Sequence, residues 1–203
     1  GIVRERLAEV LKNVKNPERL GKLKHIAEEF DIYSKDFDKV VPLRREQAKL
    51  VKDVLDPAGQ KLRIDLEQMQ KNAAAQSGNN NAVILAGEAI KLVMQVRLNG
   101  EKALARHDET SFKSTEKAFA DLKLVWASLE KAIVSTEDRR QFDQIKASAD
   151  KYHDAFLKAL HDQKEIDHVM NGEMPTKARA IAADAEAIKL SLIEDQKQTE
   201  QEV

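Results

Sequence analysis

Three arginines are the side chains of this sequence best suited to bind a charged ligand: Arg63, Arg97 and Arg179. A guanidinium group binds a carboxylate through two parallel hydrogen bonds, so two or three of them around one cavity would recognise a small organic anion. Arg97 stands inside the apolar stretch 90–98, which favours a role in ligand binding. Arg63 and Arg179 have aspartates nearby in sequence, and solvated pairing with those acids is the alternative for both.

Two tyrosines form a second pair of candidates. Tyr33 and Tyr152 each begin a Tyr-x-x-x-Phe pattern and stand beside an apolar seam of helical spacing. A tyrosine beside a core either donates its hydroxyl to a ligand oxygen or packs with that hydroxyl at the surface. The sequence leaves both interpretations open.

Motifs for catalysis and metal binding are missing from the sequence. There is no cysteine, no His-Glu-x-x-His, no phosphate-binding glycine loop and no Gly-x-Ser-x-Gly. Glu165-x-x-His168 has the spacing of the carboxylate di-metal bundles, but that chemistry needs a second such motif. We therefore expect a protein that is not an enzyme and carries no metal or cofactor.

The charge balance argues against a nucleic-acid partner. The 203 residues include 34 Lys and Arg against 35 Asp and Glu, a net charge of −1, which leaves no basic excess to neutralise phosphates. The chain also lacks the run of roughly 18–20 apolar residues that a membrane-spanning helix needs.

Composition indicates an all-α protein. The chain has only 7 Gly and 4 Pro, and aromatic residues make up 4%. Ala, Leu, Glu, Lys and Gln, which favour helices, are abundant. An all-β sandwich or barrel is excluded because it needs a turn about every 8–12 residues.

Helix-breaking residues divide the chain into long helical segments. We expect helices over 17–55 and 137–171, with a kink at Pro42, and one long helix over 82–133 with a soft interruption at 106–110. The breaks that separate the segments are Asn16-Pro17, Asp56-Pro57-Ala58-Gly59, the turn at 77–81, Ser135-Thr136 and Asn171-Gly172-Glu173-Met174-Pro175.

An internal repeat predicts the topology. Residues 16–55 align with 135–174, and the alignment matches both Tyr-x-x-x-Phe patterns and the prolines that follow them. If 82–133 spans a rod, two stacked four-helix modules of an elongated antiparallel bundle result. In that topology Arg63, Arg97 and Arg179 lie at the same level along the long axis of the bundle.

The order and spacing of short motifs along the chain resemble a known family. The sequence is similar to the helical bimodular (HBM) sensor domain of bacterial methyl-accepting chemotaxis proteins, which also occurs in some sensor histidine kinases. The motifs that carry this resemblance are Leu92-Val93-Met94-Gln95-Val96-Arg97, Leu104, His107-Asp108-Glu109, Tyr152-His153-Asp154-Ala155-Phe156, Gly172-Glu173-Met174-Pro175 and Ser191-Leu192-Ile193-Glu194-Asp195-Gln196.

The resemblance implies a periplasmic ligand-binding domain of an inner-membrane chemoreceptor. Such a domain is a homodimer, is anchored by flanking membrane helices, and signals by helix displacement after binding a small carboxylate through arginines, of which Arg97 matches. We expect a distal module of 1–55 with 107–172 and a membrane-proximal module of 57–106 with 173–203. Part of the first long helix is expected to precede residue 1.

Two other functions stay open at this point. The same domain serves sensor histidine kinases, and nothing in these residues separates the two outputs. A ligand-free helical scaffold or adaptor is the alternative of a different class. It predicts unbroken apolar seams and no buried arginine.

Overall fold

The computed structural model describes residues 2–76 and 78–201, and no strand occurs in them. This confirms the all-helical class and the helical bundle. Gly1, Ser77, Glu202 and Val203 lie outside the described residues, so the expected turn at 77–81 is described from Gly78 onward. The elements are α1 (Ile2–Asn13), α2 (Pro17–Leu50), the π-helix η1 (Val51–Leu55), α3 (Asp56–Ala75), α4 (Asn80–Arg106), α5 (Glu109–Ala132), α6 (Thr136–His168), the π-helix η2 (Val169–Glu173) and α7 (Met174–Gln201).

The chain divides into two compact units. One consists of residues 1–43 and 165–203, and the other of residues 44–164. The divisions fall inside α2 and α6, two helices that each contribute residues to both units. These boundaries replace the expected ones at residues 55, 106 and 172.

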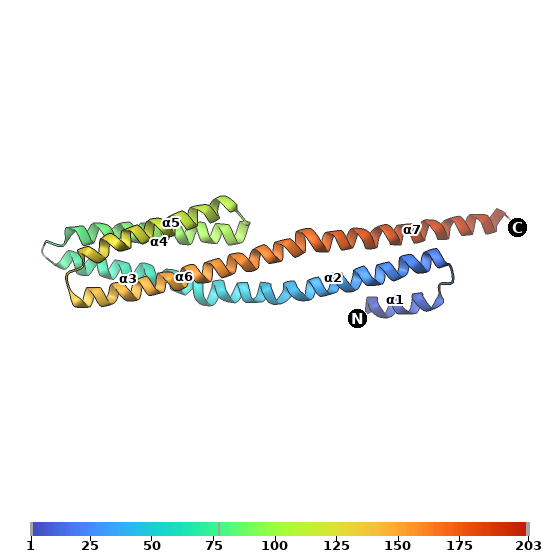
Figure 1. Cartoon of the computed structure of the whole chain (residues 1–203), viewed down its shortest axis with the longest axis horizontal. Coiled ribbons are helices and arrows are strands. Elements are labelled where there is room, and N and C mark those ends of the chain that lie inside the picture. The colour runs from blue at the N-terminus through green and yellow to red at the C-terminus, as the bar shows by residue number, and fades with distance from the viewer. Residues whose placement is uncertain (1, 77, 202–203) are drawn as a thin grey trace. The chain divides into compact units, whose positions relative to one another are not determined.

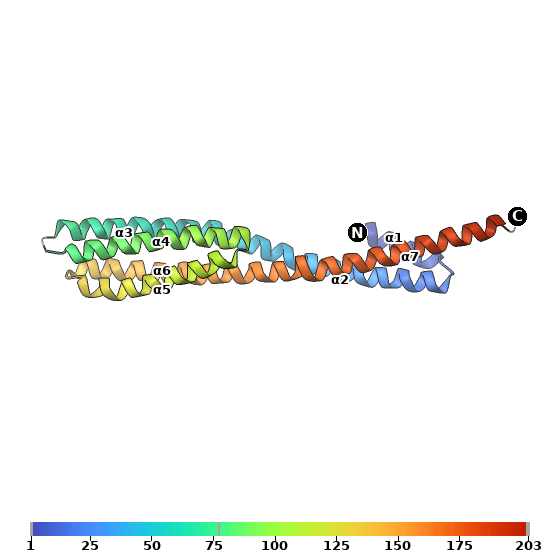
Figure 2. The same cartoon turned by 90° about the horizontal axis from the view of Figure 1, so that it is seen from above.

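The expected long helix over 82–133 is wrong, and this error accounts for the misplaced boundaries. The chain reverses between α4 and α5, which lie side by side in both views (Figures 1 and 2). His107 ends α4 in the left-handed conformation, with φ of 54°. Asp108 then caps α5 by accepting a hydrogen bond from the Thr110 amide. A left-handed residue followed by an N-cap ends one helix and begins another.

The unit of residues 44–164 is a four-helix bundle. Its helices are η1 with α3, then α4, α5 and the part of α6 up to residue 164 (Figure 2). One apolar core runs through it, in which Trp126 packs edge-on against Phe142 with ring centroids 5.6 Å apart. Members of this core include Leu62, Leu66, Val93, Val96, Phe119, Leu122, Trp126, Leu129, Phe142, Ile145, Tyr152 and Phe156.

The unit of residues 1–43 and 165–203 has a smaller buried apolar cluster, and polar contacts also link its helices. Val40, Ile166, Val169 and Met174 form one buried cluster, against which Tyr33 and Leu43 pack. Arg19 fastens α2 to α7 by donating hydrogen bonds to the Ser191 hydroxyl, the Ser191 carbonyl and the Asp195 carboxylate. Helix α1 has no buried residue.

The two halves of the chain repeat one order of elements, as the sequence alignment predicts. Helices α2 and α6 begin at Pro17 and Thr136, which are 119 positions apart, and each leads into a five-residue π-helix. Each π-helix ends two residues before a proline, Pro57 or Pro175. Proline has no amide hydrogen and its ring clashes with the carbonyl four residues earlier, so the helix widens there.

Candidate functional site

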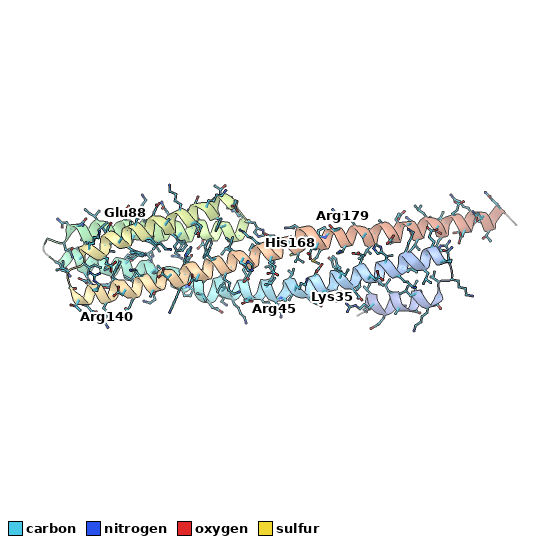
Figure 3. The ribbon with its side chains drawn as sticks, viewed as in Figure 1. Lys35, Arg45, Glu88, Arg140, His168 and Arg179 are labelled. Atoms are coloured by element: carbon cyan, nitrogen blue, oxygen red, sulfur yellow. The ribbon has the colours of Figure 1, made fainter. Side chains whose placement is uncertain are left out.

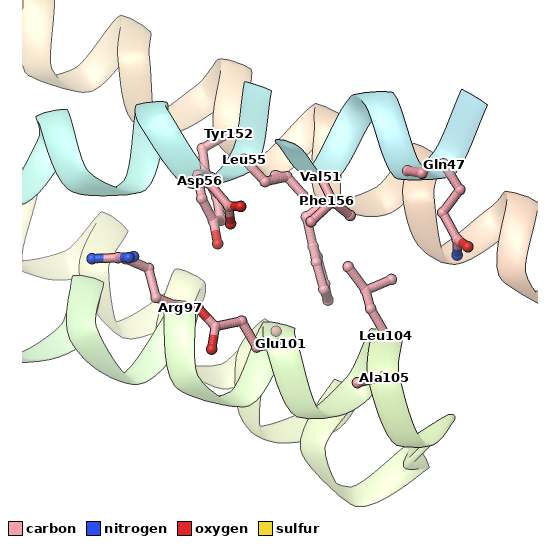
Figure 4. Close-up of a pocket in the computed structure, with 12 residues that line it drawn as sticks. Gln47, Val51, Leu55, Asp56, Arg97, Glu101, Leu104, Ala105, Tyr152 and Phe156 are labelled. Atoms are coloured by element: carbon pink, nitrogen blue, oxygen red, sulfur yellow. The ribbon is translucent and has the colours of Figure 1, made fainter. Parts of the chain in front are cut away.

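A cavity of about 430 Å³ opens in the four-helix unit beside η1. One wall comes from the end of α2, η1 and the first residue of α3, the opposite wall from α4, and α6 closes the back (Figure 4). Its described lining residues all belong to residues 44–164. They are Gln47, Ala48, Val51, Leu55, Asp56, Arg97, Gly100, Glu101, Leu104, Ala105, Tyr152 and Phe156.

The π-helix shapes the first wall of this cavity. The Asp56 amide donates to the Val51 carbonyl, a bond that spans five residues instead of four. Because the extra residue widens the turn, Val51, Leu55 and Asp56 all reach the cavity. Pro57 is the sequence feature that causes this widening.

One end of the cavity carries its charges. Arg97 and Glu101 lie four positions apart on α4, and Asp56 and Tyr152 face them from the other walls (Figure 4). Arg97 is half-buried, whereas Asp56 and Glu101 are exposed. Within residues 2–76 and 78–201, Arg97, Asp56 and Glu101 form no ion pair and no side-chain hydrogen bond. Their charged groups are therefore available to a ligand.

Tyr152 supplies a neutral hydroxyl to the same end. Burial raises the pKa of Tyr152 to about 12, with Glu101 and Asp56 adding to the rise while Arg97 opposes it. The side chain keeps its proton throughout the physiological pH range, so it can donate a hydrogen bond to a ligand oxygen.

The other end of the cavity is apolar, apart from the side-chain amide of Gln47. Val51, Leu104 and Phe156 provide the apolar surface. Gln47 is buried, and its amide nitrogen donates to the Ala159 carbonyl at 3.1 Å and to Gln163 Oε1 at 2.8 Å. Both amide hydrogens are thus already used, which leaves no free amide hydrogen at this end.

Of the five residues expected from the sequence, Arg97 and Tyr152 line the cavity. Arg63 is not among the lining residues, and its guanidinium pairs with Glu67 at 2.5 Å. The expected alternative partner, Asp65, pairs with Lys61 instead. The two arginines therefore do not meet in this cavity.

The other two expected residues belong to the second unit. Arg179 lies exposed on α7 (Figure 3) and donates to the Thr176 hydroxyl. Tyr33 is half-buried against the small cluster around Val40. Of the two tyrosines, Tyr152 borders the cavity and Tyr33 follows the alternative of packing beside a core.

Two carboxylates and one amide of the cavity were not predictable from the sequence. Asp56 stands in a stretch that indicates a helix break, while Glu101 and Gln47 look like the solvated residues of any amphipathic helix. A usable signal was present at Gly59, four residues before Arg63. A Cβ atom at position 59 would meet Arg97 and Tyr152, so a glycine inside α3 marks where these side chains pass.

Metal and membrane features are missing from the part of the chain that the structure describes. No group of three or more His, Cys, Asp or Glu side chains could hold a metal ion in residues 2–76 and 78–201. Helices in the same ranges include none that is both long and apolar enough to cross a membrane.

No protein family model matches this chain, and no curated protein matches its sequence. The function of this protein is therefore inferred from the geometry of the cavity and from the motifs of the sequence.

Proposed function

We propose that this chain is the extracytoplasmic ligand-binding domain of a transmembrane chemoreceptor and that it senses a small organic acid. One observation carries the proposal: Arg97 presents a half-buried guanidinium without an ion-pair partner, among the residues described, to a cavity of about 430 Å³. Ligand sites are concave, mostly apolar, and orient their ligand with a few polar groups. The cavity meets each of these criteria.

The resemblance to HBM sensor domains supports the same proposal. Arg97 is the arginine that matches the family motif, and it lines the cavity. The finer architecture belongs to the proposal as well: two stacked four-helix modules, of which residues 44–164 form one. In the described part of the other unit, α1 exposes Ile2, Val3 and Val10, which a further helix would cover.

Signalling follows from where the ligand binds. Tyr152 and Phe156 stand on α6, whose chain continues through η2 into α7. A ligand held between α4 and α6 favours the helix arrangement that it binds more tightly, and by no more than its difference in affinity. Helix shifts of about 1–2 Å are typical of such switches. The proposed receptor is a homodimer in the inner membrane with its sensor domain in the periplasm.

A sensor histidine kinase is the runner-up, since it would use the same cavity in the same way. A ligand-free scaffold accounts less well for the observations. It gives no reason for a half-buried unpaired arginine, or for a glycine at position 59 whose replacement would displace that arginine.

Thermal unfolding of the protein with a panel of carboxylates, amino acids, aromatic acids and inorganic anions tests the proposal. A ligand present at about 100 times its dissociation constant stabilises the folded state by about 2.7 kcal/mol. For a chain of this size each kcal/mol corresponds to roughly 2–4 °C, so the unfolding temperature then rises by roughly 5–11 °C. We expect a selective rise with one class of carboxylate.

Two arginine variants locate the binding site. Arg97→Gln should abolish the rise in unfolding temperature, whereas Arg63→Gln should retain it because Arg63 does not line the cavity. A panel in which no carboxylate stabilises the protein would contradict the proposal. If a carboxylate still raised the unfolding temperature of Arg97→Gln, its binding site would lie outside this cavity.

A further inference from the structure

The charges around the cavity do not suit a simple anion. Of the described residues that line it, Arg97 is the one cation, while Asp56 and Glu101 are two carboxylates. A monocarboxylate bound to Arg97 would leave both acids facing it, and a dicarboxylate would add two negative charges to a lining that already carries a net charge of −1. Like charges repel more strongly in a half-buried site than in water.

Arg97 and Glu101 are separated even though their spacing favours a salt bridge. An arginine and a glutamate four positions apart on a helix are neighbours and commonly pair. Here they form no ion pair, and the Arg97 side chain extends along the cavity wall in the direction away from Glu101 (Figure 4). The site therefore offers a cationic group and anionic groups side by side, each able to bind a ligand group of opposite charge.

The remainder of the cavity accepts an apolar group. Val51, Leu104 and Phe156 form that part of the lining, and the amide hydrogens of Gln47 are bonded within the protein. A second carboxylate placed there would lose its hydration without finding a side-chain donor, which is unfavourable. A hydrocarbon chain would lose no hydrogen bond there.

We propose that the ligand is an α-amino acid with an apolar side chain. Its carboxylate binds to Arg97 and the Tyr152 hydroxyl, its ammonium group binds to Asp56 and Glu101, and its side chain lies against Leu104 and Phe156. This inference rests on the proposed function and specifies the ligand class for the same site. The ligand class narrows from small organic acids in general to acids whose carboxylate and ammonium groups are bonded to the same carbon atom.

Calorimetric titration at pH 7 with matched ligands tests this inference. L-leucine is compared with 4-methylpentanoate, which lacks the amine, and with 3-methylbutylamine, which lacks the carboxylate. L-phenylalanine, 3-phenylpropanoate and 2-phenylethylamine form a second set, and succinate represents the dicarboxylates. We expect at least one of the two amino acids to bind about tenfold or more tightly than both of its single-charge analogues and than succinate.

A variant of one carboxylate separates recognition of the amine from recognition of the acid. Glu101→Gln should weaken amino-acid binding by about fivefold or more, and it should leave 4-methylpentanoate or 3-phenylpropanoate unchanged or tighter. Glu88→Gln is the matched control, because Glu88 is an exposed glutamate of α4 that does not line this cavity (Figure 3). That control should bind all ligands like the wild type.

Failure of this inference differs from failure of the proposed function. Succinate or a des-amino acid could instead bind at least as tightly as both amino acids. That result would contradict an amino-acid ligand, but the proposed function as a sensor of carboxylates would remain. Equal weakening of amino acids and des-amino acids by Glu101→Gln would also contradict an amino-acid ligand. If no carboxylate of either kind bound the protein, the proposed function itself would fail together with this inference.

Discussion

Gly59 on α3 lies directly against the side chain of Arg97 on α4. A Cβ atom at position 59 would come within 2.8 Å of Arg97 Cδ and Nε and within 3.0 Å of Tyr152 Cε2. Carbon atoms that are not bonded to each other prefer separations of about 3.5–4.0 Å. The absence of a side chain at residue 59 therefore sets the position of the guanidinium at the cavity.

Gly59→Ala should weaken ligand binding with little effect on folding. The added methyl group displaces the flexible Arg97 side chain, while alanine raises helix propensity by about 1 kcal/mol and offsets part of the steric cost. We expect the affinity for the best carboxylate to fall by about tenfold or more, with a change of no more than a few degrees in unfolding temperature. Calorimetric titration and thermal unfolding measure the two effects.

Gly21→Ala is the control for that substitution. Gly21 lies in α2, and a Cβ atom there would meet nothing within 4 Å. The unfolding temperature should rise and ligand affinity should stay unchanged. Unchanged affinity in Gly59→Ala as well would show that the position of Arg97 does not matter for binding.

Tyr152 should make the protein sensitive to strongly alkaline pH. Its pKa is raised from 10.0 to about 12 in the folded protein, chiefly by burial. Between these two values the native state retains a proton that the unfolded state has lost. The stabilisation that this group provides is therefore fully present below pH 10 and is lost as pH rises toward 12.

Absorbance titration of tyrosinate measures this pKa. The chain has two tyrosines, so Tyr33→Phe isolates the signal of Tyr152. We expect its ionisation near pH 12, and we expect Tyr152→Phe to lose less stability between pH 10 and 12 than the wild type. Ionisation of Tyr152 near pH 10 would contradict its buried position beside the cavity.

A histidine links α2 to α7 in the other unit. His25 Nδ1 lies 2.5 Å from Asp184 Oδ2, and His25 Nε2 lies 3.6 Å from Glu29 Oε1, while Lys22 also approaches Asp184 at 3.7 Å. The hydrogen bond to Asp184 raises the pKa of His25 above 6.5, with desolvation acting in the opposite direction and with charge attraction from Asp184, Glu29 and Glu28 adding to the rise.

The His25 contact should therefore weaken as pH increases. A histidine with a raised pKa contributes stability that is fully present below pH 6.5 and is lost as pH rises through its folded-state value. Unfolding temperatures of the wild type and His25→Gln should differ most in mild acid and converge in mild alkali. A difference that did not depend on pH would mean that protonation of His25 does not support the contact.

The aromatic core of the four-helix unit should dominate its stability. Phe142 is fully buried against Trp126. Phe142→Ala should lower the free energy of unfolding by about 3–5 kcal/mol through lost burial and a residual cavity. Phe37 is 54% exposed, so Phe37→Ala should change stability by no more than about 0.5 kcal/mol. Urea unfolding compares the two variants, and similar losses in both would contradict the assigned core.

The helices that begin at strong signals were predictable from the sequence. Asn16 accepts hydrogen bonds from the amides of Glu18 and Arg19, and Ser135 accepts one from Asp138, so α2 and α6 begin where the sequence indicates. The reversal at His107 escaped prediction because no glycine or proline marks it. Asp108 followed by Thr110 and Ser111 was the available signal, since its carboxylate binds both residues.

The site was only partly predictable for a related reason. Arg97 stands out because its neighbours are apolar, and Tyr152 because its pattern repeats. The expectation that Arg63 lies near Arg97 used only the position of each residue along the length of the bundle. It did not use the rotation of about 100° per residue, which decides the face of the helix that a side chain occupies. Leu62, next to it, faces the core, while Arg63 points to its helical neighbour Glu67.

The most direct test of the cavity is a crystal structure of this protein with the amino acid or carboxylate that raises its unfolding temperature most. We predict that the ligand carboxylate lies within hydrogen-bond distance of the Arg97 guanidinium and the Tyr152 hydroxyl, with the apolar part of the ligand against Leu104 and Phe156. A ligand bound elsewhere, with the cavity beside η1 still open, would contradict the account.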